Sequence, residues 1–163
     1  MKKFELTAEF VTNVFGKKLF RIKALVAFGN VEKGELGGFI EKEDNLSHDG
    51  DAWVYGNAQV FGDAWVSGNA WVSGNARVSG NAWVYDDADY AVVKGFGRYF
   101  RTTTFFRCKD KILRVQCGCF YGDLAQFREI VKKTHGDSKY AKEYLAIADL
   151  MELHFSDECG GEQ

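Results

Sequence analysis

Three residues in the second half of the chain have the chemistry of an anion-binding site: Arg98, Tyr99 and Arg101. A guanidinium group binds phosphate or carboxylate oxygens through two parallel N–H donors, and an aromatic ring stacks on a nucleobase. Trp71 and Arg77, which precede them in the chain, offer the same two kinds of group. The sequence therefore predicts that Trp71, Arg77, Arg98, Tyr99 and Arg101 bind a small anionic, nucleotide-like ligand.

The distribution of charge favours this ligand class. The formal net charge is only −2, but residues 94–142 contain twelve basic and four acidic side chains, which leaves +8 there and −10 in the remainder. A chain polarised in this way attracts anions to one end. A solvated basic surface without a ligand is the alternative. DNA binding is not expected, because the overall charge is slightly negative and no groove-reading motif is present.

Residues suited to catalysis are few. His48 lies nearest the repeats described below and could serve as a general base in acyl transfer, but we expect it to have a structural role. Cys117 and Cys119 are expected on opposite faces of one strand, which disfavours a shared metal ion, and structural zinc needs four converging ligands. We therefore expect no enzymatic activity, metal or cofactor, with acyl transfer as the alternative.

A six-residue repeat between Ala52 and Ala88 determines how the candidate residues are positioned. Alanine occurs at every sixth position, valine follows two residues later, and a Gly-Asn or Gly-Asp pair usually comes next. Successive side chains of a strand face opposite sides, so alanine and valine, which are two residues apart, should both point into a common core. Glycine and asparagine tolerate the positive φ of a corner. This period is typical of a parallel β-helix, and Val66 and Val72 are predicted to lie in its core.

Three repeats make one turn, so residues roughly eighteen apart should stack in columns on the outside of the coil. The predicted columns are Trp53 with Trp71, Ser47 with Trp65 and Trp83, and Glu41 with Gln59 and Arg77. Exposed apolar surfaces usually mark interfaces. We expect the tryptophan columns to contact neighbouring subunits or the flanking parts of the chain, with ligand stacking as the alternative.

The segment before the repeats predicts a short cap. Residues 4–10 and 19–28 alternate as two strands of a β-hairpin. Ile40 and Leu46 fall in the alanine positions of the repeat and are predicted to form an imperfect first turn. A coil this short needs a cap at both ends, and the hairpin is one candidate.

The segment after the repeats predicts two strands and two helices. The strands are expected at residues 99–107 and 112–120. A capping box at Asp123 starts a helix over residues 124–134, and a second helix begins at Ser138. The predicted parts of the chain are a β cap at 1–38, a coil at 39–91 and an α+β module at 92–163.

The repeated pattern V-x-G-N-A-x resembles the hexapeptide repeat of left-handed β-helix proteins. The chain as a whole resembles hexapeptide-repeat proteins encoded by phages and prophages, through KLFRIKAL, GELGGFIEKEDNLS, TTFFRCKDKILRVQCGCFYGDLAQF and THGDSKYAKEYLAIADLMELHF. The resemblance implies a mainly β fold, with a short left-handed parallel β-helix between an N-terminal β-hairpin cap and a C-terminal α+β module. It also implies a homotrimer and a phage-related setting, but it supplies no catalytic residues.

Three classes of function are compatible with these features. The sequence best fits a non-catalytic phage-type binding protein that counters bacterial defence, either by sequestering a small nucleotide-like signal or by blocking a defence protein. A hexapeptide acyltransferase and a structural or assembly protein of the virion are the alternatives. We expect the cytoplasm of the infected host and no membrane partner, because the chain has no long apolar run and no signal-like start.

Overall fold

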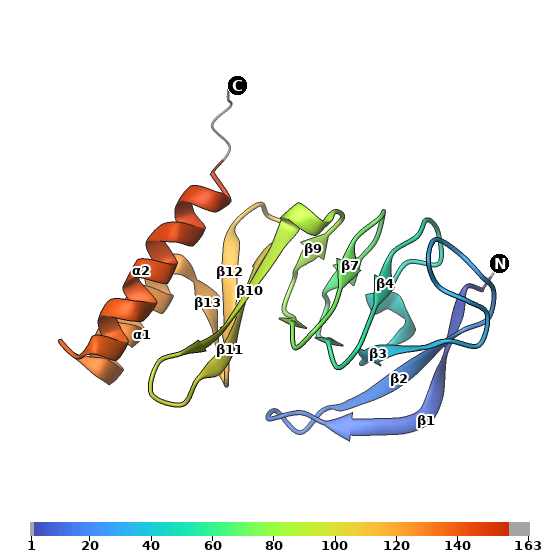
Figure 1. Ribbon diagram of the computed structural model, residues 1–163, viewed down its shortest axis with the longest axis horizontal. Helices are drawn as coiled ribbons and strands as arrows, with labels where there is room; N and C mark the ends of the chain where they lie inside the picture. Colours follow the sequence, from blue (N-terminus) through green and yellow to red (C-terminus); the bar gives the residue numbers. More distant parts are fainter. Residues whose placement is uncertain (1, 157–163) are drawn as a thin grey trace.

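The computed structural model describes residues 2–156, which form three parts arranged in a row (Figure 1). Long strands form the N-terminal end, a stack of two-residue strands forms the middle, and a four-stranded sheet with two helices forms the other end. The elements are β1 (Phe4–Thr12), β2 (Lys18–Ala24), β3 (Leu36–Ile40), η1 (Glu43–Asn45), β4 (Trp53–Val54), β5 (Gln59–Val60), β6 (Trp65–Val66), β7 (Trp71–Val72), β8 (Arg77–Val78), β9 (Trp83–Val84), η2 (Asp87–Asp89), β10 (Tyr90–Phe96), β11 (Arg101–Arg107), β12 (Leu113–Cys117), β13 (Phe120–Asp123), α1 (Leu124–His135) and α2 (Lys139–His154).

The middle part confirms the register that the repeat predicts. Strands β4, β5 and β6 pair in parallel with β7, β8 and β9, respectively. Val66 and Val72 are fully buried, together with the other alanines and valines of the repeats from Ala52 to Val84. Main-chain amides of one turn donate to carbonyls of the next, as from Tyr55 N to Val72 O at 2.8 Å. The coil is therefore held by a continuous main-chain ladder around a narrow apolar core.

The first turn of the coil differs from the predicted one. Ile40 lies beside Val60 and Leu46 beside Val66, an offset of twenty residues. The corner after Leu46 is two residues longer than the later corners, because residues 47–51 fill a space that residues 67–69 fill one turn later. The prediction that Ile40 and Leu46 take alanine positions is therefore wrong, since both take the valine position and are buried there.

The longer corner also changes two of the predicted outer columns. Phe39, and not Glu41, pairs with Gln59. The amide of Ser47 donates to the carbonyl of Val66 at 2.9 Å, which aligns Ser47 with Ser67, two residues beyond the Trp65 predicted for its column. The columns of the regular repeats are correct, because no residue is inserted between them.

The N-terminal strands confirm the predicted hairpin and cover one side of the coil. Strands β1, β2 and β3 are antiparallel, and β3 joins the coil through parallel pairing with β5 (Figure 1). The segment between β2 and β3 lies over Trp53, where the Phe28 ring meets the indole edge-on at 5.2 Å. A Cβ on Gly37 would lie 2.7 Å from the same indole. Trp53 is consequently buried, although its side chain points away from the axis of the coil.

The C-terminal sheet lies between the end of the coil and the two helices (Figure 1). Its strands follow the order β10-β11-β12-β13 and are all antiparallel. Adjacent residues of β11 face opposite sides: Phe106 packs into the coil core and Phe105 into the core under the helices. Strands β10 and β13 are additions to the predicted elements. The strand predicted over residues 112–120 ends at Cys117, and a turn leads from it into β13.

The two helices begin where the sequence predicts. Asp123 caps α1 by accepting a hydrogen bond from the amide of Gln126 at 2.8 Å, and the Gln126 side chain accepts from Asp123 N in return. Ser138 caps α2. In the described part of the chain no helix has the length and apolar character needed to cross a membrane.

Candidate functional site

Arg98, Tyr99 and Arg101 lie in or next to the connection between β10 and β11, and all three line one pocket beside the helices. The pocket has a volume of about 270 Å³, and no Asp or Glu among residues 2–156 contributes to its wall. The remaining wall is formed by Cys117, Gly118, Cys119, Phe120, Phe127, Ile130, Val131, Thr134, His135 and Tyr144. The arginine side chains therefore stand at the edge of a largely aromatic and aliphatic cavity.

The β10–β11 connection is anchored to α2. The amide of Gly97 donates to the Glu143 carboxylate at 2.9 Å, and the Tyr144 hydroxyl donates to the carbonyl of Phe96 at 3.2 Å. Gly97 has a φ of +80°, and a Cβ there would overlap with the Tyr144 hydroxyl. Phe100 also adopts a positive φ, of +55°, which is uncommon for a residue other than glycine. This tight turn holds the two arginines near the pocket.

The two guanidinium groups rest on aromatic rings. Arg98 lies over the Tyr140 ring at 4.8 Å, and Arg101 lies over the Tyr99 ring at 5.6 Å. Within residues 2–156 neither arginine forms an ion pair with a carboxylate. Arg101 also crosses the turn at Gly118, where a Cβ would lie 2.8 Å from its Nη1. Cation–π contact orders both side chains while their positive charge stays available to an anion.

Tyr144 and His135 form the aromatic side of the pocket. Their rings stack with centroids 5.8 Å apart and an interplanar angle of 28°. Burial raises the pKa of Tyr144 to about 12, so its hydroxyl keeps its proton throughout the neutral range. Tyr144 can therefore pack against a ligand, but its single O–H proton is already donated to the carbonyl of Phe96, and it does not act as a base near pH 7.

Cys117 and Cys119 both line this pocket, so their predicted placement on opposite faces of one strand is wrong, because residues two apart along a strand face the same side and Cys119 lies beyond the end of β12. Strand β12 ends at Cys117, and Gly118, with a φ of +58°, begins the turn into β13. The Cys117 sulfur accepts a hydrogen bond from Thr103 Oγ1 at 3.2 Å. Among residues 2–156 no group of three or more His, Cys, Asp or Glu side chains is arranged to hold a metal ion.

Arg77 and Trp71 do not join the other three predicted residues. Arg77 lines a second, smaller pocket beside the N-terminal hairpin. Trp71 is half-buried against Tyr55, with ring centroids 5.9 Å apart, and its carbonyl accepts a hydrogen bond from the Tyr90 hydroxyl. The predicted five-residue site is thus divided between three places, and only the cluster at Arg98, Tyr99 and Arg101 surrounds one cavity.

His48 is held in a structural network, as expected. Its Nδ1 accepts from the amide of Lys3 at 3.0 Å, and its Nε2 contacts the Glu43 carboxylate at 2.8 Å. The imidazole stacks on Phe4 with centroids 4.2 Å apart. Both ring nitrogens are therefore occupied, and the ring links the N-terminal strand to the longer first corner of the coil.

Trp65 and Trp83 form the tryptophan column that is exposed to solvent, called the open column below. Their indoles meet edge to face at 5.6 Å, and 38% and 44% of their surfaces are exposed. Together with Tyr85 they border a shallow groove of about 630 Å³. Lys109 lies over the Trp83 ring at 5.7 Å. This groove is distant in sequence from the arginine-lined pocket and shares no lining residue with it.

Sequence reasoning missed the pocket residues that come from the helices. Tyr144 of α2 and Phe127 of α1 are not among the residues predicted to bind a ligand. Both are buried in the core beneath the helices and also border the pocket. The available signal was a tyrosine hydroxyl on an otherwise apolar face, because a buried hydroxyl needs a partner.

Comparison with known protein families gives a match in the coil alone. A family model described as the YdcK β-solenoid repeat matches residues 58–74 and 70–86. The middle of the chain is accordingly a β-solenoid, in agreement with its parallel strand pairs. No curated protein matches the chain. The family match does not include the residues that form the arginine-lined pocket.

Proposed function

We propose that this chain is a non-catalytic binding protein that holds a small anionic, nucleotide-like ligand in the pocket between the β10–β11 connection and the helices. The observation that carries the proposal is that Arg98 and Arg101, without carboxylate partners in the described chain, border one cavity with aromatic walls. Guanidinium groups bind phosphate oxygens in a forked geometry. Tyr99 and the helix aromatics supply surfaces for a flat base.

The volume of the pocket limits the size of the ligand. About 270 Å³ lies just below the usual range for small-molecule pockets. This space suits a mononucleotide, or one half of a larger nucleotide whose other half extends past the exposed side chains of Arg98 and Tyr99. A long acyl chain fits less well, because the cavity ends against the buried side chains of Phe127 and Val131.

Binding without turnover is favoured by the state of the nearby polar groups. Tyr144 keeps its proton at neutral pH, since burial raises its pKa to about 12. His48, the candidate base for acyl transfer, is engaged through both ring nitrogens with Lys3 and Glu43. These contacts make the acyltransferase alternative less favourable than binding alone.

A protein that binds without turnover acts by removing its ligand from solution. In the cytoplasm of an infected bacterium, which is the setting implied by the phage resemblance, such a ligand would be a nucleotide-like signal of host defence. The homotrimer expected from the same resemblance would provide three pockets. This biological role rests on the resemblance, whereas the binding proposal rests on the residues around the pocket.

The proposal is tested by titrating the purified protein with AMP and, separately, with adenosine in an isothermal calorimeter. AMP should bind and adenosine should bind much more weakly, because only AMP carries the phosphate. Arg98→Ala and Arg101→Ala should each weaken AMP binding roughly ten- to a hundred-fold, the usual effect of one lost charge-assisted contact.

Lys94→Ala serves as the matched control, because Lys94 is an exposed cation on β10 that does not line the pocket. It should leave AMP binding unchanged. Equal binding of AMP by the wild type and both arginine variants would remove the pocket from consideration as the anion site.

A further inference from the structure

A second pocket lies where the three parts of the chain meet. It has a volume of about 120 Å³. The tip of the β1–β2 hairpin supplies residues 12–15, the outer face of the coil supplies Gln59, Phe61 and Arg77, and the C-terminal sheet supplies Gln116 and Gly118. No Asp or Glu in the described part of the chain lines this pocket. Among the described residues, Gly118 lines both this pocket and the larger one.

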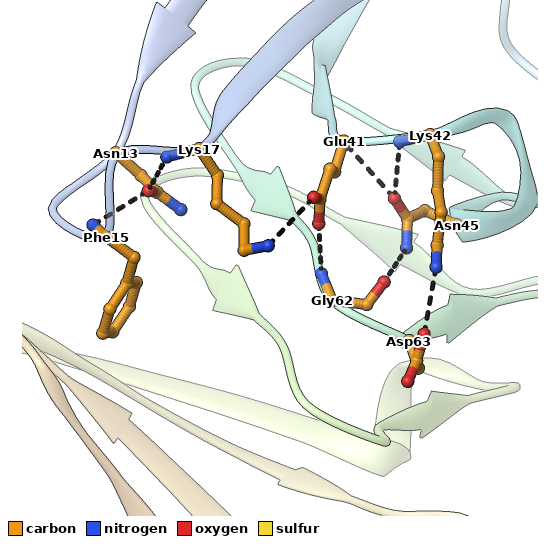
Figure 2. A network of polar contacts seen from close by, with 8 residues as sticks. All are labelled: Asn13, Phe15, Lys17, Glu41, Lys42, Asn45, Gly62 and Asp63. Atoms are coloured by element: carbon orange, nitrogen blue, oxygen red, sulfur yellow. Dashed lines mark hydrogen bonds and ion pairs between the residues drawn. The ribbon is translucent and has the colours of Figure 1, made fainter.

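Asn13, which lines this pocket, has a buried side-chain donor that is unpaired within the described residues. Its Oδ1 accepts hydrogen bonds from the amides of Phe15 at 2.9 Å and Lys17 at 3.0 Å (Figure 2). These two donors fix the orientation of the side-chain amide, because the opposite orientation would place N–H groups against N–H groups. Nδ2 must then point away from the turn, where it is buried and has no hydrogen-bond partner.

The hairpin tip that carries Asn13 is fastened to the coil. Lys17 forms an ion pair with Glu41 at 3.4 Å, and the other oxygen of Glu41 accepts from the amide of Gly62 at 2.8 Å (Figure 2). The Phe15 ring packs near the Phe61 ring, with centroids 6.1 Å apart. The Lys17–Glu41 ion pair and the Phe15–Phe61 contact therefore hold the turn that carries Asn13 against the coil.

Gln59 adds a hydrogen-bond acceptor and Arg77 adds a positive charge to the residues that line this pocket. The Oε1 atom of Gln59 is a buried acceptor without a hydrogen-bond partner. Arg77 is exposed, and no ion pair between it and an acidic side chain occurs in the described residues. By contrast, Gln116 is satisfied, because it accepts from Ser79 Oγ at 2.7 Å and donates to the carbonyl of Gly118 at 2.8 Å.

We infer that this pocket binds a small tetrahedral oxyanion that carries its own proton, as hydrogen phosphate does. The guanidinium of Arg77 and the Asn13 amide would donate to its oxygens, and its hydroxyl would donate to Gln59 Oε1. A buried donor and a buried acceptor both need partners, which a protonated oxyanion supplies together. The volume equals that of about four liquid water molecules and is sufficient for such an ion.

The acceptor at Gln59 should allow the pocket to distinguish phosphate from sulfate. Sulfate has nearly the same size and shape as phosphate but carries no proton at neutral pH, so one of its oxygens would face the unpaired Gln59 oxygen. Calorimetric titration at pH 7 and constant ionic strength should show inorganic phosphate binding roughly tenfold or more tightly than sulfate. Equal binding of the two ions, or no phosphate binding at millimolar concentration, would overturn the inference and leave a pocket filled by water.

Two variants test the assigned groups. Asn13→Asp keeps the oxygen that accepts from Phe15 and Lys17 but replaces the free donor with a second carboxylate oxygen, so phosphate binding should be lost. Arg77→Gln changes only an exposed side chain, so the fold should be retained while phosphate affinity falls at least tenfold. Unchanged phosphate affinity in folded Arg77→Gln protein would contradict the assignment.

Arg98→Ala is the matched control, because Arg98 lines the larger pocket and not this one. It should weaken AMP binding and leave phosphate binding unchanged. The proposed nucleotide site and the phosphate site can thus fail independently of each other.

Discussion

The coil and the C-terminal module differ in how regular their backbone is and in what their side chains surround. In the coil, amides of the short strands donate to carbonyls of the neighbouring turn, as from Tyr55 to Val72, and the alanine and valine side chains of successive repeats fill the interior. In the C-terminal module, irregular turns with positive φ at Phe100 and Gly118 hold charged and aromatic side chains around a cavity. A regular repeat provides stability, whereas sites arise where the repeat stops or another part meets it.

The largest expected effect is the loss of the coil. Val72→Asp would place a carboxylate in a narrow apolar core where Val72 is fully buried and no cation faces it. An unpaired buried charge costs more than the stability of an ordinary domain can compensate. We expect no cooperative thermal transition by circular dichroism. A melting temperature within a few degrees of the wild type would contradict the register of the coil.

A smaller effect should separate the two tryptophan columns. Trp53→Ser should lower the free energy of unfolding by about 3–5 kcal/mol, because it removes a large buried side chain. Trp65→Ser, at the equivalent position on the open column, should change it by less than about 1 kcal/mol in the monomer. Urea denaturation of both variants provides the comparison, and equal losses would contradict the different burial of the two indoles.

The open column is also the expected contact between copies of the chain. If the protein is a homotrimer held partly by Trp65 and Trp83, replacing both with Ser should weaken assembly without unfolding the subunit. Light scattering at micromolar concentration measures the mass of each form. A stable monomer of the unmodified protein would exclude the trimer.

The smallest effect concerns Lys3, which lies buried against the first turn of the coil. Its Nζ donates to the carbonyl of Ala52 at 2.7 Å, yet burial lowers its pKa from 10.5 to about 8. Between these values the unfolded chain keeps a proton that the folded chain has released, so the contribution of Lys3 to stability rises with pH.

Urea denaturation at pH 7.5, 9 and 10 should therefore show the wild type gaining stability relative to Lys3→Met as pH increases. The gain cannot exceed about 1.4 kcal/mol per pH unit. A difference that stays flat or falls with pH would mean that the hydrogen bonds of the ammonium group outweigh its desolvation.

The sequence predicted the regular elements of the fold because their signals are local. The period of six aligns Trp65 with Trp83, and Asp123 with Gln126 marks the start of α1. The first turn was predicted incorrectly because two additional residues after Leu46 change the register without altering the hydrophobic pattern nearby. Such an insertion becomes visible only when Leu46 is paired with a residue on another turn.

Part of the candidate site was predictable because its residues are close together in the sequence. Arg98, Tyr99 and Arg101 are neighbours in the chain, so one turn brings them together. Tyr144 and His135 reach the same cavity from the helices, and their position depends on how α1 and α2 pack on the sheet. Periodicity can indicate which face of a helix is buried, but it cannot indicate which residues of that face border a cavity.

The most direct test of ligand binding is native mass spectrometry of the protein after incubation with a nucleotide-rich cell lysate. We predict a retained small anion that is lost from the Arg98→Ala, Arg101→Ala double variant, kept by Lys94→Ala, and chemically unchanged after release by denaturation. Recovery of a converted product with more than one turnover per subunit would contradict non-catalytic binding. Equal retention by the wild type and the double variant would contradict the proposed pocket.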